Sequence, residues 1–309
     1  MTHQWLACDM PSLQGTIAIV TGANSGLGLE TTLGLAAAGA TVVMACRNPA
    51  KAQPALAQLL QKLPHAQLYL MTLDLSDLTS VRRFATECAQ RFSHIDLLCN
   101  NAGVMALPYQ LTRDGFEMQI GTNHFGHFAL TGLLLDQLKA APAARIVTVA
   151  SVAHRGTKSF DLDDPHWQRK AYRKNEAYAR SKLANLLFTL ELSRRLRASG
   201  SAMRAVAAHP GYAATGIVDA ATAGSAIKRF LVQLGNALIA QPADRGALPS
   251  LYAASMADMQ CGEYIGPHGF LQFRGWPTRV DCTPAARNTE TARGLWALSE
   301  QLTGVSYLS

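Results

Sequence analysis

The chain of 309 residues has 28 Lys and Arg against 21 Asp and Glu, which gives a net charge of +7 with neutral histidines. Apolar residues make up 49% of the chain and charged residues only 16%, so it can bury a large core, which excludes disorder throughout. No uninterrupted apolar stretch reaches the roughly 18 residues that a membrane span needs, and the first residues lack the apolar segment of a signal peptide. We therefore expect a cytoplasmic protein with no transmembrane segment.

The positive charge alone does not identify a partner. An excess of Lys and Arg is compatible with binding nucleic acid, acidic lipid or an anionic small ligand, and it can also serve only to keep the protein in solution. No zinc finger, basic zipper or RNA-binding aromatic motif accompanies the clustered Lys and Arg residues. We therefore expect no nucleic-acid partner, and we expect most of the charge to lie on solvated helix faces.

Short apolar runs alternate with helix-length segments through the first two thirds of the chain. The runs show little internal alternation, as strands buried on both faces of a parallel sheet do. They are residues 16–20, 41–45, 67–72, 95–99, 145–150 and 204–208, with a seventh near 263–265. The helix-length segments are 27–38, 50–62, 78–92, 115–139, 175–198 and 243–257. The pattern predicts a doubly wound α/β fold with a mainly parallel seven-stranded sheet and helices on both faces.

Two segments interrupt this alternation within what we expect to be a single domain of residues 1–309. Residues 154–174 follow the fifth strand and residues 213–242 follow the sixth. Loops beyond the carboxyl ends of the strands are where an open α/β sheet binds its ligand, so we expect a substrate loop and a lid here. The apolar face at 227–238 suits either a lid or a subunit interface, and residues 266–309 form a C-terminal extension.

A glycine-rich turn, Thr-Gly-Ala-Asn-Ser-Gly-Leu-Gly at residues 21–28, connects the first strand to a helix. Glycines let backbone N–H groups approach a pyrophosphate, and the helix N-terminus then faces the anion. Such a turn can also be a plain strand-to-helix connection, but the complete βαβ unit around it favours dinucleotide binding. The candidate cofactor residues in the turn are Gly22, Asn24, Ser25, Gly26, Leu27 and Gly28.

The end of the second strand indicates which dinucleotide binds. An NAD site places a carboxylate about twenty residues beyond the glycines, on the ribose hydroxyls, whereas an NADP site uses Arg for the 2′-phosphate. Arg47 occupies this position, Asn48 follows it, and residues 31–73 contain no Asp or Glu. Arg47 could also be a solvated strand-end arginine, but the pattern favours NADP(H).

Tyr178 and Lys182 lie four residues apart, which puts both on one helix face. A phenol is a poor base at neutral pH, and a nearby ammonium lowers its pKa by favouring the phenolate. Taken alone, such a pair is usually a surface coincidence. Its place after the fifth strand, which ends at Ser151, favours an acid–base role.

With these motifs in register, the chain resembles a short-chain dehydrogenase/reductase over most of its length. The family's Asn-Asn-Ala-Gly motif corresponds to residues 100–103, and its Pro-Gly-x-x-x-Thr motif to residues 210–215. The resemblance implies a Rossmann sheet. It also implies the further cofactor-binding residues Asp74, Leu75, Asn101, Ala102, Gly103, Tyr178, Lys182, Pro210, Gly211 and Thr215.

The resemblance also implies a catalytic set of Asn123, Ser151, Tyr178 and Lys182. Tyr178 would exchange the proton and Ser151 would hydrogen-bond the substrate oxygen. Lys182 would lower the pKa of Tyr178 and hold the ribose hydroxyls, and Asn123 would bind a water that links Lys182 to solvent. These roles amount to general acid–base catalysis with stabilisation of the substrate oxygen.

Segments 43–47, 123–128, 151–154 and 181–185 are similar to the retinol-dehydrogenase-like branch and its bacterial relatives, as is the long spacing of 27 residues from Ser151 to Tyr178. The sequence therefore predicts NADP(H)-dependent interconversion of a carbonyl and an alcohol on a fairly apolar small molecule, with Met105 and Tyr212 as candidate pocket walls. A C=C reductase similar to protochlorophyllide reductase and a non-catalytic NADP(H) sensor are the alternatives. Substrate identity, physiological direction and assembly as a homodimer or homotetramer stay open.

Four histidines near these motifs invite a functional interpretation. His124 and His127 have metal-ligand spacing, but no third ligand is suitably placed, so we expect helix packing and no metal site. His154 and His209 are expected either to line the pocket or to have a structural role.

Overall fold

The computed structural model describes residues 4–212 and 241–308. The run at 227–238 and Thr215 lie outside the described residues. Among the described helices, none combines the length and the apolar character that crossing a membrane requires.

The described residues form one eight-stranded sheet in which β1 lies between β2 and β4. Every neighbouring pair is parallel except β7 and β8. In sheet order the strands are β3 (Leu68–Thr72), β2 (Thr41–Cys46), β1 (Ile17–Thr21), β4 (Leu97–Asn100), β5 (Arg145–Val149), β6 (Arg204–Ala208), β7 (Tyr264–Pro267) and β8 (Pro277–Arg279). The chain leaves β1 and β4 toward opposite edges, so a ligand crevice is expected at their carboxyl ends.

The doubly wound parallel sheet confirms the predicted fold class, but the predicted number of seven strands is wrong. The eighth strand, Pro277–Arg279, is a three-residue edge strand antiparallel to β7. It was missed because three residues beginning with Pro carry no apolar run from which a strand could be recognised.

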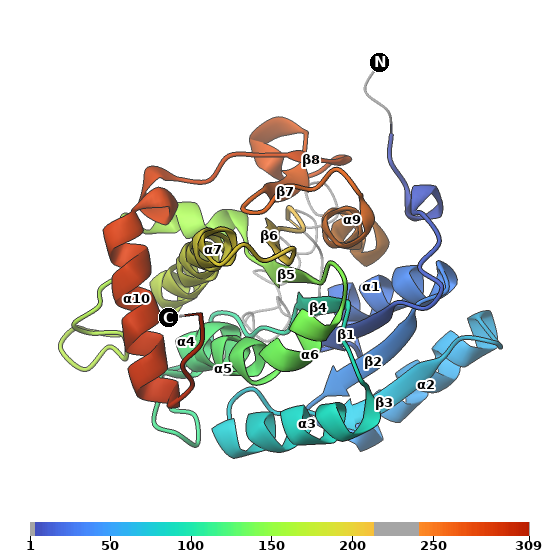
Figure 1. Ribbon diagram of the computed structural model, residues 1–309. Coiled ribbons are helices and arrows are strands. Elements are labelled where there is room, and N and C mark those ends of the chain that lie inside the picture. Colours follow the sequence, from blue (N-terminus) through green and yellow to red (C-terminus); the bar gives the residue numbers. More distant parts are fainter. Residues whose placement is uncertain (1–3, 213–240, 309) are drawn as a thin grey trace, which may run out of the picture.

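Helices cover both faces of the sheet (Figure 1). The helices α1 (Gly26–Ala37), α2 (Pro49–Lys62) and α9 (Ala243–Ser255) lie on one face. The other face carries α3 (Leu78–Arg91), α5 (Gly126–Leu133), α6 (Leu135–Ala140) and α7 (Lys174–Ala198), and α10 (Thr289–Thr303) packs outside α7. Asp77 caps α3, since its side chain accepts hydrogen bonds from the N–H groups of Thr79 and Ser80.

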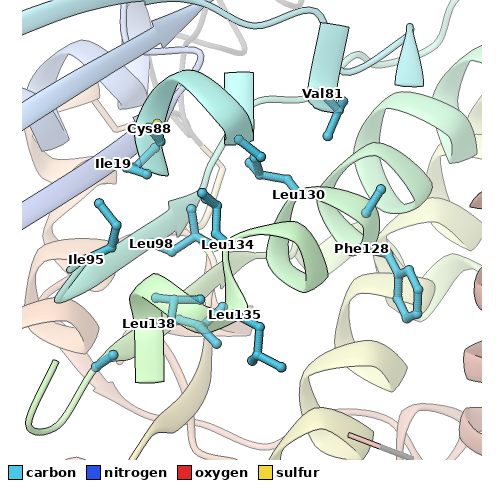
Figure 2. Packing of buried hydrophobic residues seen from close by; sticks show 14 of the residues in the cluster. Ile19, Val81, Cys88, Ile95, Leu98, Phe128, Leu130, Leu134, Leu135 and Leu138 are labelled. Carbon is cyan, nitrogen blue, oxygen red and sulfur yellow. The ribbon is translucent and has the colours of Figure 1, made fainter. Parts of the chain in front are cut away.

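Successive β1 side chains enter different hydrophobic clusters. Ile19 packs in the cluster beneath α3 and α5, whereas Ala18 and Val20 belong to the cluster on the α1 and α9 side. Figure 2 shows part of the first cluster, with Leu98 of β4 facing Leu130 and Leu134. Burial of both faces explains why the strands are continuously apolar and could be recognised in the sequence.

The segment predicted to be helical over residues 115–139 is helical from Met118 onward, but it is interrupted. This segment consists of α4 (Met118–Ile120), a π-helical turn (Gly121–Phe125), α5 and α6. The backbone passes so close to β3's carboxyl-end loop that a Cβ at Gly126 would lie 2.4 Å from the Leu75 carbonyl oxygen. A π-helical turn inside a helix often marks a functional site, and this one contains Asn123.

Candidate active site

A cavity of about 470 Å³ opens at the carboxyl ends of β1 to β4. Most of the predicted cofactor residues line it, although they come from separate motifs: Gly22, Asn24, Ser25, Gly26, Leu27, Gly28, Arg47, Asp74, Leu75, Asn101, Ala102 and Gly103. Motif analysis missed five further lining residues: Ala45, Leu73, Ser76, Val104 and Thr122. Asn48 is not among the lining residues, and its side chain instead caps α2 by accepting a 3.1 Å hydrogen bond from the Lys51 N–H. We call this space the dinucleotide cavity.

The glycine turn has the shape that close approach of a phosphate requires. Gly22 and Gly26 have left-handed φ angles of 67° and 51°, a region that favours glycine. A Cβ at Gly28 would lie only 2.2 Å from the Gly22 carbonyl oxygen. The turn therefore exposes backbone rather than side chain at the N-terminus of α1, as an anion site does.

Hydrogen bonds join this turn to the Asn-Asn-Ala-Gly motif after β4. The Asn101 side chain donates to the Thr21 carbonyl at 2.7 Å. The backbone N–H groups of Asn101 and Ala102 both donate to the Thr21 hydroxyl oxygen at 2.9 Å. The two motifs are thus one rigid unit, although about eighty residues separate them in the sequence.

The charges around the dinucleotide cavity suit a phosphorylated ligand. Arg47 is exposed at the rim and forms no ion pair with another described residue. The Asp74 carboxylate already has neighbouring hydrogen-bond donors, because its Oδ1 accepts from the Ser76 N–H at 2.9 Å and from the Ser76 hydroxyl at 2.6 Å. The cavity thus combines a free guanidinium with backbone donors, a donor set that fits a pyrophosphate and a further phosphate group.

A second, larger cavity of about 1210 Å³ adjoins the first, and both are lined by Leu27, Asn101, Gly103 and Val104. Its lining includes the predicted residues Ser151, Tyr178, Lys182, Pro210 and Gly211. We call it the substrate cavity. Asn123 lies behind its wall, fully buried.

Ser151, Tyr178 and Lys182 meet where β5 ends against the first turns of α7. The Ser151 oxygen accepts a 3.1 Å hydrogen bond from the Ala153 N–H, and its hydroxyl hydrogen-bonds Tyr178. The Lys182 ammonium donates to the Val149 carbonyl at 2.9 Å and lies 5.8 Å from the centre of the Tyr178 ring. The sequence thus placed these three side chains in one site correctly.

The pKa values of this group differ from the sequence-based prediction. Burial raises the pKa of Tyr178, while its hydrogen bond with Ser151 acts in the opposite direction. Burial also lowers the pKa of Lys182 to about 8. The pKa of Tyr178 is therefore raised, not lowered as the spacing to Lys182 predicted, because the effect of burial outweighs that of the hydrogen bond with Ser151.

Asn123 connects the π-helical turn to both sides of the site. Its side-chain oxygen accepts from the Val104 N–H at 2.8 Å, and its amide donates to the Val104 carbonyl at 3.0 Å and to the Ser181 hydroxyl at 2.9 Å. These bonds use both amide hydrogens. The side chain therefore holds segments of the chain together, and the predicted water-binding role stays a prediction.

The outer wall of the substrate cavity comes partly from residues without any motif. Met105 and Tyr212 line it as predicted, but Leu271 and Phe273, from the connection between β7 and β8, were missed. No local pattern identifies these two residues, because their place depends on the pairing of β7 with β8.

His154 and His209 do not line either cavity. The Nδ1 atom of His154 lies 2.6 Å from the Ser151 carbonyl, and the Nδ1 atom of His209 accepts from the Gly211 N–H at 3.1 Å. Both histidines hydrogen-bond to backbone groups and line neither cavity, so the structural role is the correct one of the two that were expected for them. Burial lowers the pKa of His209 to about 3.

Comparisons with known proteins agree with this geometry. Residues 16–162 match the family model described as short chain dehydrogenase. Human retinol dehydrogenase 13 is 39% identical over 298 residues, which cover 95% of this chain and 86% of that protein. A solved structure of an uncharacterized protein from Mycobacterium paratuberculosis is 44% identical, covers 99% of both chains and has a TM-score of 0.81.

A more distant solved structure is described as an NAD(P) dependent gluconate 5-dehydrogenase from Beutenbergia cavernae with bound NADP at low occupancy. It is 25% identical, covers 79% of this chain and 91% of its own, and has a TM-score of 0.62.

The doubly wound sheet and the paired cavities define a dinucleotide-binding oxidoreductase of small molecules. The similarity to human retinol dehydrogenase 13 extends over 95% of this chain, which makes the family assignment specific. The chain belongs to the short-chain dehydrogenase/reductase family, in the branch that is similar to the retinol dehydrogenases.

Proposed function

We propose that this protein is an NADP(H)-dependent oxidoreductase that interconverts a carbonyl and an alcohol, with Tyr178 as the acid–base residue. The observation that carries the proposal is the position of Ser151, Tyr178 and Lys182 in a cavity that adjoins the dinucleotide cavity. The relatives named retinol dehydrogenase support oxidation or reduction of this class of substrate.

Arg47 supports NADP(H) over NAD(H). Its guanidinium lines the dinucleotide cavity without an ion-pair partner among the described residues, and no carboxylate occurs between residues 31 and 73. A planar guanidinium suits a phosphate, whereas a ribose diol would require a carboxylate there. The glycine turn would hold the pyrophosphate, and the bound dinucleotide supplies or accepts the hydride.

In the direction of reduction, Tyr178 donates a proton to the carbonyl oxygen while the Ser151 hydroxyl hydrogen-bonds that same oxygen. The raised pKa of Tyr178 keeps the phenol protonated at neutral pH, and the protonated phenol is the form that donates in this direction. The Lys182 ammonium lies 5.8 Å from the centre of the Tyr178 ring and supplies positive charge beside the phenol that loses its proton. In the direction of oxidation the same residues act in reverse, with Tyr178 accepting the proton.

The substrate cavity favours an apolar substrate. Met105, Ala106, Leu271 and Phe273 supply apolar parts of the wall, and the charged residues Arg155, Arg173, Lys174 and Glu176 also line this cavity. Apolar walls with a few convergent polar groups are typical of sites that bind hydrophobic small molecules.

The test is NADPH consumption by wild type and Tyr178→Phe protein against a panel of apolar aldehydes, ketones and quinones. We expect Tyr178→Phe to lower turnover about 1000-fold, because the proton donor is lost, and to leave NADPH affinity within about threefold. Tyr109→Phe is the matched control, since the exposed Tyr109 donates to the His166 carbonyl and lines neither cavity. Near-normal turnover of Tyr178→Phe contradicts the assignment, and NADPH binding by wild type without turnover of any carbonyl favours the sensor alternative.

A further inference from the structure

His127, on the first turn of α5, connects the turn after β1 to the π-helical turn. The residue is only 2% exposed, yet both ring nitrogens have hydrogen-bond partners. Its Nδ1 atom lies 3.1 Å from the Asn123 carbonyl oxygen, and its Nε2 atom lies 2.9 Å from the Thr21 hydroxyl oxygen. One partner thus belongs to the π-helical turn and the other to the glycine turn.

The bond to Asn123 fixes which nitrogen carries the proton. A carbonyl oxygen can only accept, so Nδ1 must be the donor. Burial and the nearby Lys182 charge lower the pKa of His127 to about 4, so the ring is neutral at physiological pH. A neutral ring that is protonated on Nδ1 has a bare Nε2, which must accept.

The Thr21 hydroxyl leads independently to the same assignment. Its oxygen already accepts from the N–H groups of Asn101 and Ala102, both at 2.9 Å, and these fill its two lone pairs. The hydroxyl must then donate its own hydrogen. The His127 Nε2 atom at 2.9 Å is a nearer acceptor than the Cys99 carbonyl at 3.4 Å.

The two assignments together describe a directed path of buried hydrogen bonds. It runs from the backbone donors of Asn101 and Ala102 through the Thr21 hydroxyl to the His127 ring and ends at the Asn123 carbonyl. Asn123 in turn hydrogen-bonds Val104, which lines both cavities, and Ser181 of α7. Each member of the path is fixed by its neighbour, as in other fully satisfied buried networks.

We propose that His127 is a positioning residue that couples the dinucleotide cavity to the catalytic segment around Asn123. This inference rests on the proposed function of the site. His127 lines neither cavity, and acts by holding the Asn123 carbonyl at one end and the Thr21 hydroxyl at the other. The expectation that it only packs within a helix is therefore replaced.

His124 offers a direct contrast on the same helical segment. It is as deeply buried, but its Nε2 atom bonds the Ser299 hydroxyl at 2.9 Å, and its Nδ1 atom has no partner among the described residues. Its ring packs against Phe125, Phe128 and Phe188. For His124 the predicted packing role holds, which makes it a matched control.

Two substitutions separate the ends of the path, because an Asn amide reaches the place of Nδ1 and a Gln amide reaches the place of Nε2. We expect His127→Asn to keep the bond to Asn123, leaving kcat at saturating NADPH within about threefold, and to weaken NADPH binding about tenfold. We expect His127→Gln to show the converse, with NADPH affinity within about threefold and kcat lowered about tenfold. NADPH fluorescence titration and steady-state rates measure the two quantities separately.

Thr21→Val and Thr21→Ser test the hydroxyl end of the path, where the bonds to Asn101 and Ala102 are lost together with the bond to His127. The valine removes the hydroxyl and should weaken NADPH binding about tenfold, and the serine should restore it. His124→Asn should lower the melting temperature without changing NADPH affinity or kcat. The proposal is overturned if both His127 variants match wild type, if they lose affinity and kcat in equal proportion, or if Thr21→Val binds NADPH normally. The affinity measurements need no substrate, so they test the coupling even if every carbonyl proves inactive.

Discussion

The two cavities of this protein are built in different ways. Eight of the seventeen residues that line the dinucleotide cavity are Gly, Ala or Ser, and most of the lining comes from the motifs that follow β1 to β4. The substrate cavity is lined by residues from segments that lie far apart in the sequence, from Leu27 to Phe273. A site formed by backbone leaves a strong local pattern because few residues tolerate its geometry, whereas a wall of side chains can be formed by many sequences.

The sharpest test of this difference is Gly28→Ala. An added Cβ would lie 2.2 Å from the Gly22 carbonyl and 2.6 Å from the Asn101 amide nitrogen, so the turn must shift. We expect NADPH affinity, measured by fluorescence titration, to fall at least about 100-fold, a cost of about 2.7 kcal/mol.

Gly132→Ala is the control for a clash that is remote from both cavities. A Cβ there would lie 2.4 Å from the Tyr307 ring, in the core between α5 and the C-terminal residues. This variant should lose thermal stability and keep its NADPH affinity. Equal loss of affinity in the two variants would mean that the glycine turn has no special part in binding.

The same difference explains how far the sequence could be interpreted. The seven longer strands and the residues from Gly22 to Gly28 were predictable, because burial on both faces and the glycine geometry each require particular residue types. The π-helical turn depends on the approach of Gly126 to the Leu75 carbonyl, which becomes visible only once β3 and α5 are packed. Leu271 joins the cavity only through sheet pairing.

His127 illustrates a second limit of sequence analysis. Its spacing from Asn123 is an ordinary helical spacing, and a buried histidine is most often a packing residue. Its contact with Thr21 joins residues 106 apart in the sequence, and no local pattern contains it. The function of such a residue therefore becomes visible only from its complete set of hydrogen-bond partners.

Arg47→Ala tests the cofactor preference of the dinucleotide cavity. A charge-assisted bond to a phosphate contributes about 1.5–3 kcal/mol, so kcat/KM for NADPH should fall about ten- to a hundredfold. The value for NADH should stay within about twofold, because NADH has no 2′-phosphate. Steady-state rates with both cofactors measure the change in preference.

Lys51→Ala is the matched control for Arg47→Ala. Lys51 is an exposed cation on α2, four residues further along the chain, and it does not line the cavity. It should leave both kcat/KM values unchanged. A parallel loss for NADPH and NADH in Arg47→Ala would show that the guanidinium does not select the phosphate.

The substrate cavity should differ from the dinucleotide cavity in its response to alkaline pH. Burial lowers the pKa of Lys182 to about 8, so its ammonium form is present below that pH and is lost above it. The pKa of Tyr178 is raised, so the phenol stays protonated over this range. We expect the rate of carbonyl reduction at saturating NADPH to fall about tenfold from pH 7 to pH 9. Lys182→Arg should flatten this decline, and a wild type rate that is constant to pH 10 would contradict the role of the ammonium.

The smallest predicted effect concerns the wall of the substrate cavity that no motif marks. Leu271 has a left-handed φ of 51° and is 52% exposed, so Leu271→Gly relieves about 1 kcal/mol of backbone strain while removing apolar surface from the cavity. We expect KM for an apolar carbonyl to rise about three- to fivefold, with NADPH affinity and melting temperature nearly unchanged. Phe270→Ala is the neighbouring control, because Phe270 is 83% exposed and does not line the cavity. If both variants raise KM alike, the loop acts through its general apolar surface rather than through the wall at Leu271.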